Sequence, residues 1–351
     1  MKTIIVTGGL GFIGSNFIRR ILKKSLFKLV INIDKLTYAG NPENLSAYEN
    51  HSGYLFINAD ILNSSSTLDN LRNHKVDMLI NFAAESHVDR SIDGPEKFVE
   101  TNVNGTLSLL EAAKNYLKEC NETKKKDFRF LQVSTDEVYG SLKDDDPAFC
   151  ESTSYAPNSP YAASKAAADH IARSYHRTFG VPVLTTNCSN NYGPYQFPEK
   201  LIPLIILNAY EGKSLPIYGD GLNKRDWLHV EDHCTAILKV LKFGKVGETY
   251  CIGGGSEKTN LEVIETLCTL LDSKIPQFAP HRELMNFVKD RPGHDRRYAI
   301  NYSKISKELA WQPSFSFQDG IRQTVEWYLD NLPWCENVMS GKYQRERLGN
   351  S

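Results

Sequence analysis

The stretch TIIVTGGLGFIGSNFIRR, Thr3–Arg20, decides the fold class of this chain. Its first four residues form a short apolar, mostly β-branched run, which is typical of a strand buried on both faces. Closely spaced glycines follow: Gly9, Gly11 and Gly14 fit G-x-G-x-x-G, and Gly8, with the last two, fits G-x-x-G-x-x-G. Apolar residues then recur with a helical period. The stretch therefore predicts a strand, a glycine turn and a helix.

This arrangement has the physical properties of a dinucleotide site. Glycine lets the backbone approach a pyrophosphate, and the N-terminus of the helix presents N–H groups and a positive dipole end to the anion. A second apolar run, KLVINID, ends at Asp34, 20 residues beyond Gly14. A carboxylate at this place is expected to bind the ribose hydroxyls of the cofactor. Because it repels a 2′-phosphate, we expect NAD rather than NADP; the adjoining Lys35 weakens this preference slightly.

Strand and helix patterns continue to alternate after Asp34. We expect strands at residues 54–60, 76–84 and 128–134, and a long amphipathic helix at 98–117. This alternation predicts an α/β fold with a Rossmann-type, doubly wound parallel sheet. Ligands of such sheets bind beyond the carboxyl ends of the strands. The residues expected at those ends are Asp34, Asp60, Ala83 and Ser134.

Composition and charge exclude several classes of protein. The chain has 351 residues, of which 41% are hydrophobic and 24% charged, and a net charge of -1. These values are ordinary for a globular protein of one or two domains and give no sign of binding to nucleic acid or to a membrane surface. No segment approaches the roughly 20 apolar residues of a membrane span. Seven cysteines without a C-x-x-C pair argue against disulfides and zinc, so we expect a cytoplasmic protein without a bound metal.

The alanine-rich segment 160–180 predicts a helix that carries a reactive pair. Tyr161 and Lys165 are four residues apart, so they share one face of this helix. A phenol next to an ammonium is expected to ionise more easily. Such a tyrosine can take the proton of an alcohol while hydride leaves to a nicotinamide. The hydroxyls of Ser134 and Thr135, at a strand end, make this combination more specific than Y-x-x-x-K alone.

At this point the sequence resembles the extended short-chain dehydrogenase/reductase family, and within it the nucleotide-sugar 4,6-dehydratases. Small departures, at Leu10 and Asn301, touch none of the expected reactive residues. The stretches that carry the resemblance run nearly end to end: TGGLGFIG, FAAESHVDRSI, STDEVYG, YAASK, NCSNNYGPYQFPEKLIPL, GDGLNKRDWLHVEDH and DRPGHDRRYAI. The resemblance implies tightly bound NAD and conversion of a nucleotide-linked glucose to its 4-keto-6-deoxy form and water. It favours dTDP-glucose over UDP-glucose as the substrate.

The resemblance also gives a reason for the adjacent carboxylates Asp136 and Glu137 in STDEVYG. Epimerases of the same family usually carry small polar residues there. Dehydration needs a base for the C5 proton and an acid for the departing C6 hydroxyl. By the family pattern Glu137 is the base and Asp136 the acid, in a catalytic set with Thr135, Tyr161 and Lys165. The alternative is a solvated turn without a role in catalysis.

Cofactor and substrate residues follow from the same pattern. The expected cofactor set is Gly8, Gly11, Phe12, Ile13, Gly14, Asp34, Lys35, Asp60, Ile61, Ala83, Ser134, Tyr161 and Lys165. The expected substrate set is His87, Asn190, Lys200, Tyr218, Arg225, Asn260, Arg291 and His294. Of these, Asn190, Arg225 and Arg291 are expected at the substrate pyrophosphate, where planar guanidinium groups suit a diphosphate.

The alternation of strands and helices breaks after the strand that follows residue 180. We therefore expect an NAD-binding domain at 1–188, to which later segments return, and a smaller C-terminal substrate-binding domain mainly in 189–351. The helices at 98–117 and 161–179 have apolar and alanine-rich faces. The resemblance implies that they pair across a homodimer, although the same faces could simply cover the sheet.

Three alternatives need to be distinguished from this interpretation. His229 and His233 are four residues apart, as in some zinc sites, but the glutamate stands one place too late for the metalloprotease pattern. An epimerase or decarboxylase on the same fold is disfavoured by the acid pair. A non-catalytic NAD-binding regulator would commonly lack the tyrosine or the lysine, and this chain has both.

Overall fold

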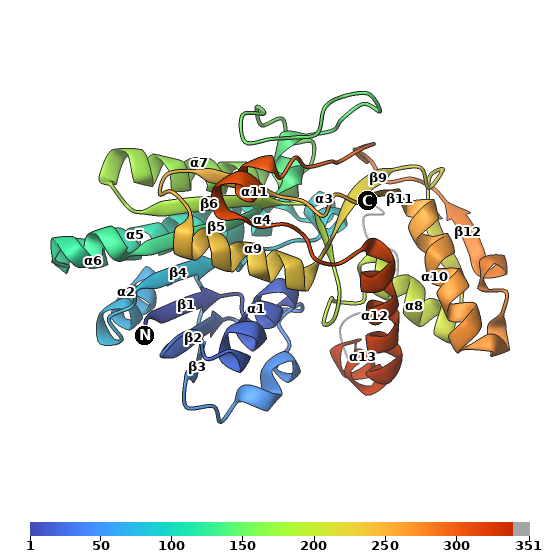
Figure 1. Cartoon of the computed structure of the whole chain (residues 1–351), viewed down its shortest axis with the longest axis horizontal. Helices are drawn as coiled ribbons and strands as arrows, with labels where there is room; N and C mark the ends of the chain where they lie inside the picture. The colour runs from blue at the N-terminus through green and yellow to red at the C-terminus, as the bar shows by residue number, and fades with distance from the viewer. Residues whose placement is uncertain (340–351) are drawn as a thin grey trace.

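The computed structural model describes residues 1–339 and places a seven-stranded sheet at the centre of the first domain (Figure 1). All neighbouring strands in this sheet are parallel. The strands in spatial order are β10 (Thr249–Ile252), β6 (Val183–Cys188), β5 (Arg129–Thr135), β4 (Met78–Asn81), β1 (Thr3–Thr7), β2 (Leu29–Asp34) and β3 (Tyr54–Asn58). The Rossmann-type fold predicted from the sequence is thus confirmed.

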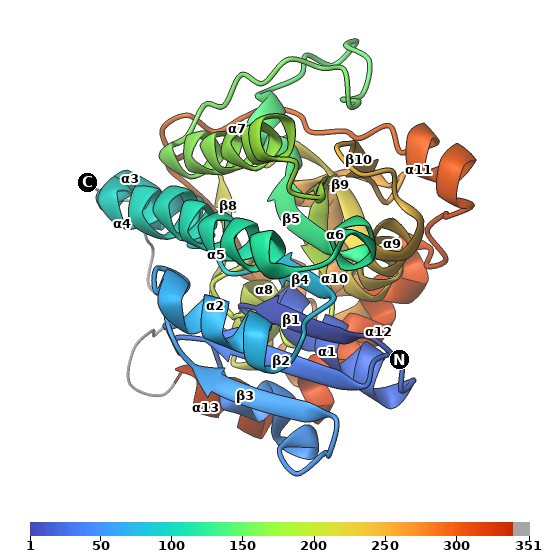
Figure 2. The ribbon, with the colours of Figure 1, turned by 90° about the vertical axis from the view of Figure 1, so that its left-hand side faces the viewer.

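Helices cover both faces of this sheet because its central strand is apolar on both sides. Ile4 and Val6 point to one face and Ile5 to the other, and all three are fully buried. The first face is covered by α1 (Phe12–Lys23), α9 (Val230–Phe243) and α11 (Ser303–Leu309). The second is covered by α2 (Ser64–Asn73), α5 (Gly105–Glu119) and α7 (Pro160–Phe179). Figure 2 shows α5 and α7 side by side on the outside of the molecule.

The long helix expected at 98–117 forms, with a π-helical segment inside it. The chain forms α3 (Val88–Asp93) and α4 (Pro95–Phe98), then a π-helical segment, η2 (Val99–Asn104), before α5. Within η2, the Asn102 side chain accepts a bond from Glu85 N at 2.8 Å and donates to Ser164 Oγ at 2.8 Å. The wider π turn accompanies this link, which ties the loop after β4 to helix α7.

The part of the chain that is expected to form the second domain has an apolar cluster of its own. It contains the sheet β11 (Glu257–Thr259), β9 (Lys224–His229), β7 (Asn190–Tyr192) and the pair β12 (Met285–Val288), β8 (Leu215–Tyr218). Around its core lie α8 (Leu201–Tyr210), α10 (Asn260–Lys274), α12 (Phe317–Asp330) and α13 (Leu332–Met339). The remaining helical elements are α6 (Glu122–Asp127), η1 (Pro42–Tyr48), η3 (Asp136–Tyr139), η4 (Pro276–Phe278) and η5 (His281–Leu284). Residues 340–351, which the expected second domain includes, lie outside the described residues.

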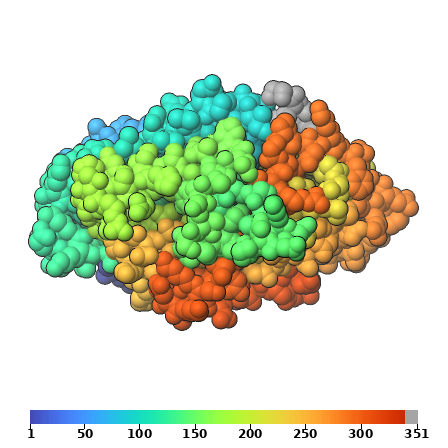
Figure 3. Space-filling model, turned by 90° about the horizontal axis from the view of Figure 1, so that it is seen from above, coloured from blue at the N-terminus to red at the C-terminus, as the bar shows by residue number. Residues whose placement is uncertain are grey.

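A late segment of the chain returns to the end of β5. Leu142 N donates to Arg297 O at 3.0 Å, and Phe149 N donates to Ala299 O at 2.8 Å. Figure 3 shows the same meeting from above, where the green surface of the loop after β5 adjoins the orange surface of this late segment. The contact brings the DRPGHDRRY stretch close to the acid pair. Within residues 1–339, no helix is both long and apolar enough to cross a membrane.

Candidate active site

A cleft lies at the carboxyl ends of the strands and extends toward the second domain. Its lining contains every residue of the expected cofactor set and every residue of the expected catalytic set, together with Asn190 and Lys200. The other expected substrate residues lie outside this lining: His87, Tyr218, Arg225, Asn260, Arg291 and His294. The structure therefore brings the cofactor set and the catalytic set together, while the individual roles remain predictions.

The glycine turn allows a close approach of two backbone segments at the base of the cleft. Gly8 has φ +66°, and a Cβ added there would lie 2.6 Å from Ala83 N, so no side chain fits. Helix α1 begins directly after Gly11, with no capping side chain and no acidic residue in its first turn. Its first N–H groups are thus left to an anion. This part of the chain fits a dinucleotide pyrophosphate.

Asp34 lies at the end of β2 with its carboxylate held in place. Leu10 N donates to Asp34 Oδ2 at 3.0 Å, and Leu36 N donates to Oδ1 at 2.9 Å. Burial raises the pKa of Asp34, and these two N–H groups and Lys35 oppose the shift. Lys35 Nζ forms an ion pair with Asp60 Oδ2 at 3.1 Å. Because Lys35 is already paired with a carboxylate, it is a poor partner for a 2′-phosphate.

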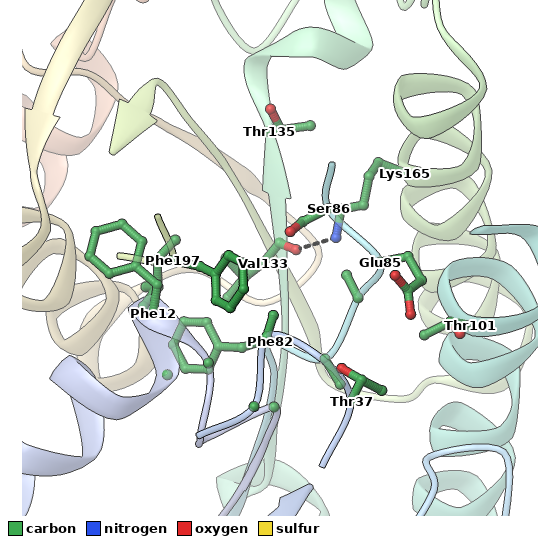
Figure 4. A pocket seen from close by; sticks show the side chains of 18 of the residues that line it. Phe12, Thr37, Phe82, Glu85, Ser86, Thr101, Val133, Thr135, Lys165 and Phe197 are labelled. Carbon is green, nitrogen blue, oxygen red and sulfur yellow. Dashed lines mark hydrogen bonds between the residues drawn. The ribbon is translucent and has the colours of Figure 1, made fainter. Parts of the chain in front are cut away.

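Tyr161 and Lys165 do not have the electrostatic relation expected from their spacing. Lys165 Nζ donates to Val133 O at 2.7 Å, the dashed line in Figure 4. Burial lowers the pKa of Lys165, whereas the pKa of Tyr161 is raised well above its ordinary value, first by burial and then by Glu137. Burial and the charge of Glu137 thus act against the ready ionisation expected for this phenol.

The acid pair is not a solvated turn. Asp136 is 2% exposed; its Oδ1 accepts a bond from Thr135 Oγ1 at 3.3 Å, and its Oδ2 has no partner. Burial, followed by the charge of Glu137, raises the pKa of Asp136 well above its usual range. Burial also raises the pKa of Glu137, but Arg291, Arg225 and Lys200 oppose that shift. The two adjacent carboxyls therefore differ: Asp136 keeps its proton more readily, and Glu137 faces three cations.

Bonds to backbone carbonyls and one ion pair hold these three cations in position. Lys200 Nζ donates to Ser86 O at 3.1 Å, and Arg291 Nη1 pairs with Asp89 Oδ1 at 3.1 Å. Arg225 donates to the carbonyls of residues 224 and 295 at 2.7 and 2.9 Å, with its guanidinium 4.2 Å from the centroid of the Tyr298 ring. Cations fixed in this way form one positive wall beside Glu137.

The remaining expected substrate residues lie around this wall. Burial and the nearby cations lower the pKa of His87 to about 2, so its imidazole is neutral. His294 Nδ1 lies 2.6 Å from Asp290 Oδ1, and burial lowers the pKa of His294 to about 4. Tyr218 ends β8, and Asn260 begins α10.

The HVEDH segment has a structural role at the start of α9. His229 Nδ1 accepts a bond from Glu231 N at 3.4 Å, and His233 Nδ1 lies 2.9 Å from Asn191 Oδ1. Among the described residues, no group of three or more histidine, cysteine, aspartate or glutamate side chains is placed to hold a metal.

Sequence reasoning missed several residues of the cleft. Figure 4 shows three aromatic side chains, Phe12, Phe82 and Phe197, gathered on one side of the cleft, of which only the first was expected. Glu199 was also missed; it is buried, pairs with Arg90 at 3.1 Å and accepts a bond from Tyr38 OH at 3.3 Å. Its position directly before Lys200, in a stretch that carries the family resemblance, is the signal that could have found it.

Comparison with known proteins supports the family that the sequence motifs indicate. The model of the family described as GDP-mannose 4,6 dehydratase matches residues 5–324. A dTDP-glucose 4,6-dehydratase of Xanthomonas campestris pv. campestris (strain B100) is 53% identical over 351 residues, covering 99% of both chains. One of Shigella flexneri is 55% identical over 349 residues, covering 97% of this chain and 96% of the relative. This chain belongs to the nucleotide-sugar 4,6-dehydratases.

A solved structure of this family has the same architecture. The dTDP-glucose 4,6-dehydratase of Streptomyces venezuelae, solved with NAD and TYD bound, superposes with a TM-score of 0.88 at 46% identity. The alignment covers 96% of this chain and 99% of the Streptomyces chain. The family membership expected from the sequence motifs is confirmed.

Proposed function

We propose that this member of the nucleotide-sugar 4,6-dehydratases is a hydro-lyase that converts dTDP-glucose to dTDP-4-keto-6-deoxyglucose and water, with NAD as its cofactor. The observation that carries the proposal is the buried pair Asp136 and Glu137, placed in one cleft with Tyr161, Lys165 and the glycine turn. Relatives that are 53% and 55% identical over nearly their whole length are dTDP-glucose 4,6-dehydratases, which supports thymine as the base.

Bound NAD would supply the acceptor for the hydride of C4 and the donor of the same hydride to C6, so that the overall reaction would have no net redox change. The residues of the cleft fit this cofactor. The turn at Gly8 and the open N-terminus of α1 suit its pyrophosphate, and the fixed carboxylate of Asp34 suits its adenosine ribose. The pairing of Lys35 with Asp60 favours NAD over NADP.

The side chains of the cleft divide the proton transfers among them. Tyr161 takes the proton of the C4 hydroxyl as its phenolate, a form that a hydrogen bond from Thr135 favours and that the positive nicotinamide of bound NAD+ would favour further. Thr135 and Lys165 position the reacting groups. Once C4 is a ketone, Glu137 removes the acidified C5 proton, and the cations beside it stabilise its charged form. Asp136, whose pKa burial raises, is the better proton donor of the pair and donates a proton to the C6 hydroxyl, which leaves as water.

The substrate diphosphate is assigned to the positive wall formed by Lys200, Arg225 and Arg291. The amide of Asn190, which lines the cleft, is assigned to the same diphosphate through its Nδ2 donor. We assign His87 to the sugar end of the substrate, and Tyr218, Asn260 and His294 to the nucleotide end. The fixed guanidinium of Arg225 suits the bidentate geometry of phosphate oxygens.

Incubation with dTDP-glucose and with UDP-glucose tests the proposed function, with the products identified by mass. We expect loss of one water from dTDP-glucose and slower conversion of UDP-glucose. An epimerase would give a product of unchanged mass, a decarboxylase is tested with the corresponding uronic acid, and a non-catalytic regulator would give none. Faster conversion of UDP-glucose would overturn the assignment of the base.

We also propose that the enzyme is a cytoplasmic homodimer that pairs through α5 and α7. Apolar side chains are exposed on or next to these helices: Leu107 at 38%, Val99 at 50% and Phe179 at 53%. All seven cysteines lie within residues 1–339 and none forms a disulfide, which fits a reducing compartment. Light scattering on the purified protein should give twice the mass of one chain. Leu107→Glu should shift the measured mass toward that of a single chain.

The first prediction concerns cofactor choice. NAD+ should bind at least about tenfold more tightly than NADP+, because two like charges about 4 Å apart repel by about 4 kcal/mol at an effective dielectric constant of 20. Titration of the nucleotide-free protein with each cofactor measures the two dissociation constants. Asp34→Asn should bring the dissociation constants of NAD+ and NADP+ closer together. Equal binding of NADP+ by the unaltered protein would remove the role of Asp34 and implicate Lys35.

A second prediction tests the positive wall. Arg225→Lys should weaken substrate binding by about 1.5–3 kcal/mol, since an ammonium cannot reproduce the planar fork. Steady-state kinetics should give a raised KM and a lowered kcat/KM. Arg296→Lys is the matched control, because Arg296 is exposed and pairs with Asp220 at 3.0 Å on the surface. Unchanged kinetics in Arg225→Lys would place Arg225 outside the substrate site.

A further inference from the structure

The last described helix contacts the loop that supports the glycine turn. Trp334 Nε1, in α13, donates a hydrogen bond to Asn44 Oδ1, in η1, at 2.9 Å, across 290 residues of sequence. Trp334 is 8% exposed and Asn44 is 2% exposed. A buried bond of this kind is costly to leave unmade, because neither group can turn to water instead.

Asn44 passes this contact on to the cofactor turn. Its Nδ2 donates to Leu10 O at 2.8 Å, and Asn41 N donates to the same carbonyl at 3.1 Å. Leu10 stands between Gly9 and Gly11, and its own N–H donates to Asp34 Oδ2 at 3.0 Å. A continuous series of hydrogen bonds thus runs from the indole of α13 to the carboxylate expected to bind the ribose.

The amide of Asn44 has one satisfactory orientation. The indole N–H is only a donor and the Leu10 carbonyl only an acceptor, so a flipped amide would lose both bonds. Arg19, in α1, donates to Asn44 O at 3.1 Å and lies 4.7 Å from the centroid of the Tyr195 ring. That ring is 5.7 Å from the ring of Trp334. Packing and the hydrogen bond from Arg19 therefore fix Trp334 and the backbone of Asn44.

We propose that Trp334 and Asn44 are positioning residues that hold the glycine turn and Asp34 in the geometry that retains NAD. This inference rests on the proposed function, because it takes NAD to be the ligand of the turn. Without the indole N–H, the Asn44 amide is oriented only by its own bond to the Leu10 carbonyl, so that bond weakens and the turn is held less firmly at the cofactor.

The test compares two tryptophans of one aromatic cluster. Trp334→Phe keeps an aromatic ring and removes the N–H donor. Trp327→Phe makes the same change in a ring whose centroid lies 5.1 Å from that of Trp334 and which does not bond Asn44. Two quantities are measured: amide hydrogen exchange over residues 8–14 without added nucleotide, and the rate at which NAD+ leaves the holoenzyme after dilution. Melting temperatures of both variants measure general destabilisation.

We expect Trp334→Phe to exchange faster at the turn and to release NAD+ about three- to tenfold faster, the range for one lost neutral hydrogen bond. The KM for dTDP-glucose at saturating NAD+ should stay the same, and Trp327→Phe should change neither quantity. The proposal would be overturned if Trp334→Phe and Trp327→Phe changed hydrogen exchange and NAD+ release equally. It would also be overturned if both quantities changed only in proportion to the melting temperature. Faster exchange without faster release would overturn it too. A wild-type protein that binds no NAD+ overturns the proposed function instead, and unchanged exchange overturns the structural link by itself.

Discussion

Glu137→Gln and Asp136→Asn should each lower the overall turnover of dTDP-glucose by about 10²–10⁴-fold, the usual contribution of a general acid or base. Both replacements keep the size of the side chain and remove its ability to exchange a proton. The first oxidation, at C4, uses Tyr161 and not the acid pair, so it should survive. Each variant should then accumulate reduced cofactor on mixing with substrate.

Near-ultraviolet absorbance of the enzyme after rapid mixing measures this accumulation directly. Glu119→Gln is the matched control, because Glu119 is an exposed carboxylate that pairs with Arg72 and should leave turnover unchanged. Normal turnover in Glu137→Gln would show that the acid pair is not catalytic. A lack of reduced cofactor in both acid variants would show that the carboxylates position the substrate for oxidation instead of carrying the elimination.

Tyr161→Phe should also lower turnover by about 10²–10⁴-fold, but without accumulation of reduced cofactor. The hydroxyl is lost while the ring, which packs edge-on against Phe98 at 6.2 Å, is kept, so the fold and cofactor binding should persist. Because the C4 hydroxyl then has no base, the reaction stops before hydride leaves. The same absorbance measurement therefore separates this variant from the two acid variants.

A control for Tyr161→Phe lies on the same helix. Tyr175→Phe removes a hydroxyl that bonds to Glu111 at the far end of α7 and should leave turnover unchanged. Reduced cofactor in Tyr161→Phe, formed at the rate of the unaltered enzyme, would contradict the role of Tyr161. Some other group would then be taking the C4 proton.

The sequence by itself determined the features that depend on neighbouring residues. The turn at Gly8 requires a residue that tolerates φ > 0 and close backbone contact. Only glycine does so readily, so the sequence around Gly8 predicts the turn. The placement of Asp34 follows from the length of one helix and one strand. The helix with Tyr161 and Lys165 follows from alanine content and from its capping residues. The acid pair was found because both carboxylates are adjacent in one motif.

Only the tertiary structure decided how those groups behave. Asp136 and Glu137 stand side by side in the sequence, yet burial and the arginines from β9 and the DRPGHDRRY stretch make their surroundings different. The spacing of Tyr161 and Lys165 suggested a lowered pKa for the phenol, whereas burial and the charge of Glu137 act in the opposite direction. The contact of Trp334 with Asn44 has no sequence signal at all. The physical reason is that desolvation and charge interactions depend on distances in space. Those distances are set only when segments that are far apart in the chain pack together.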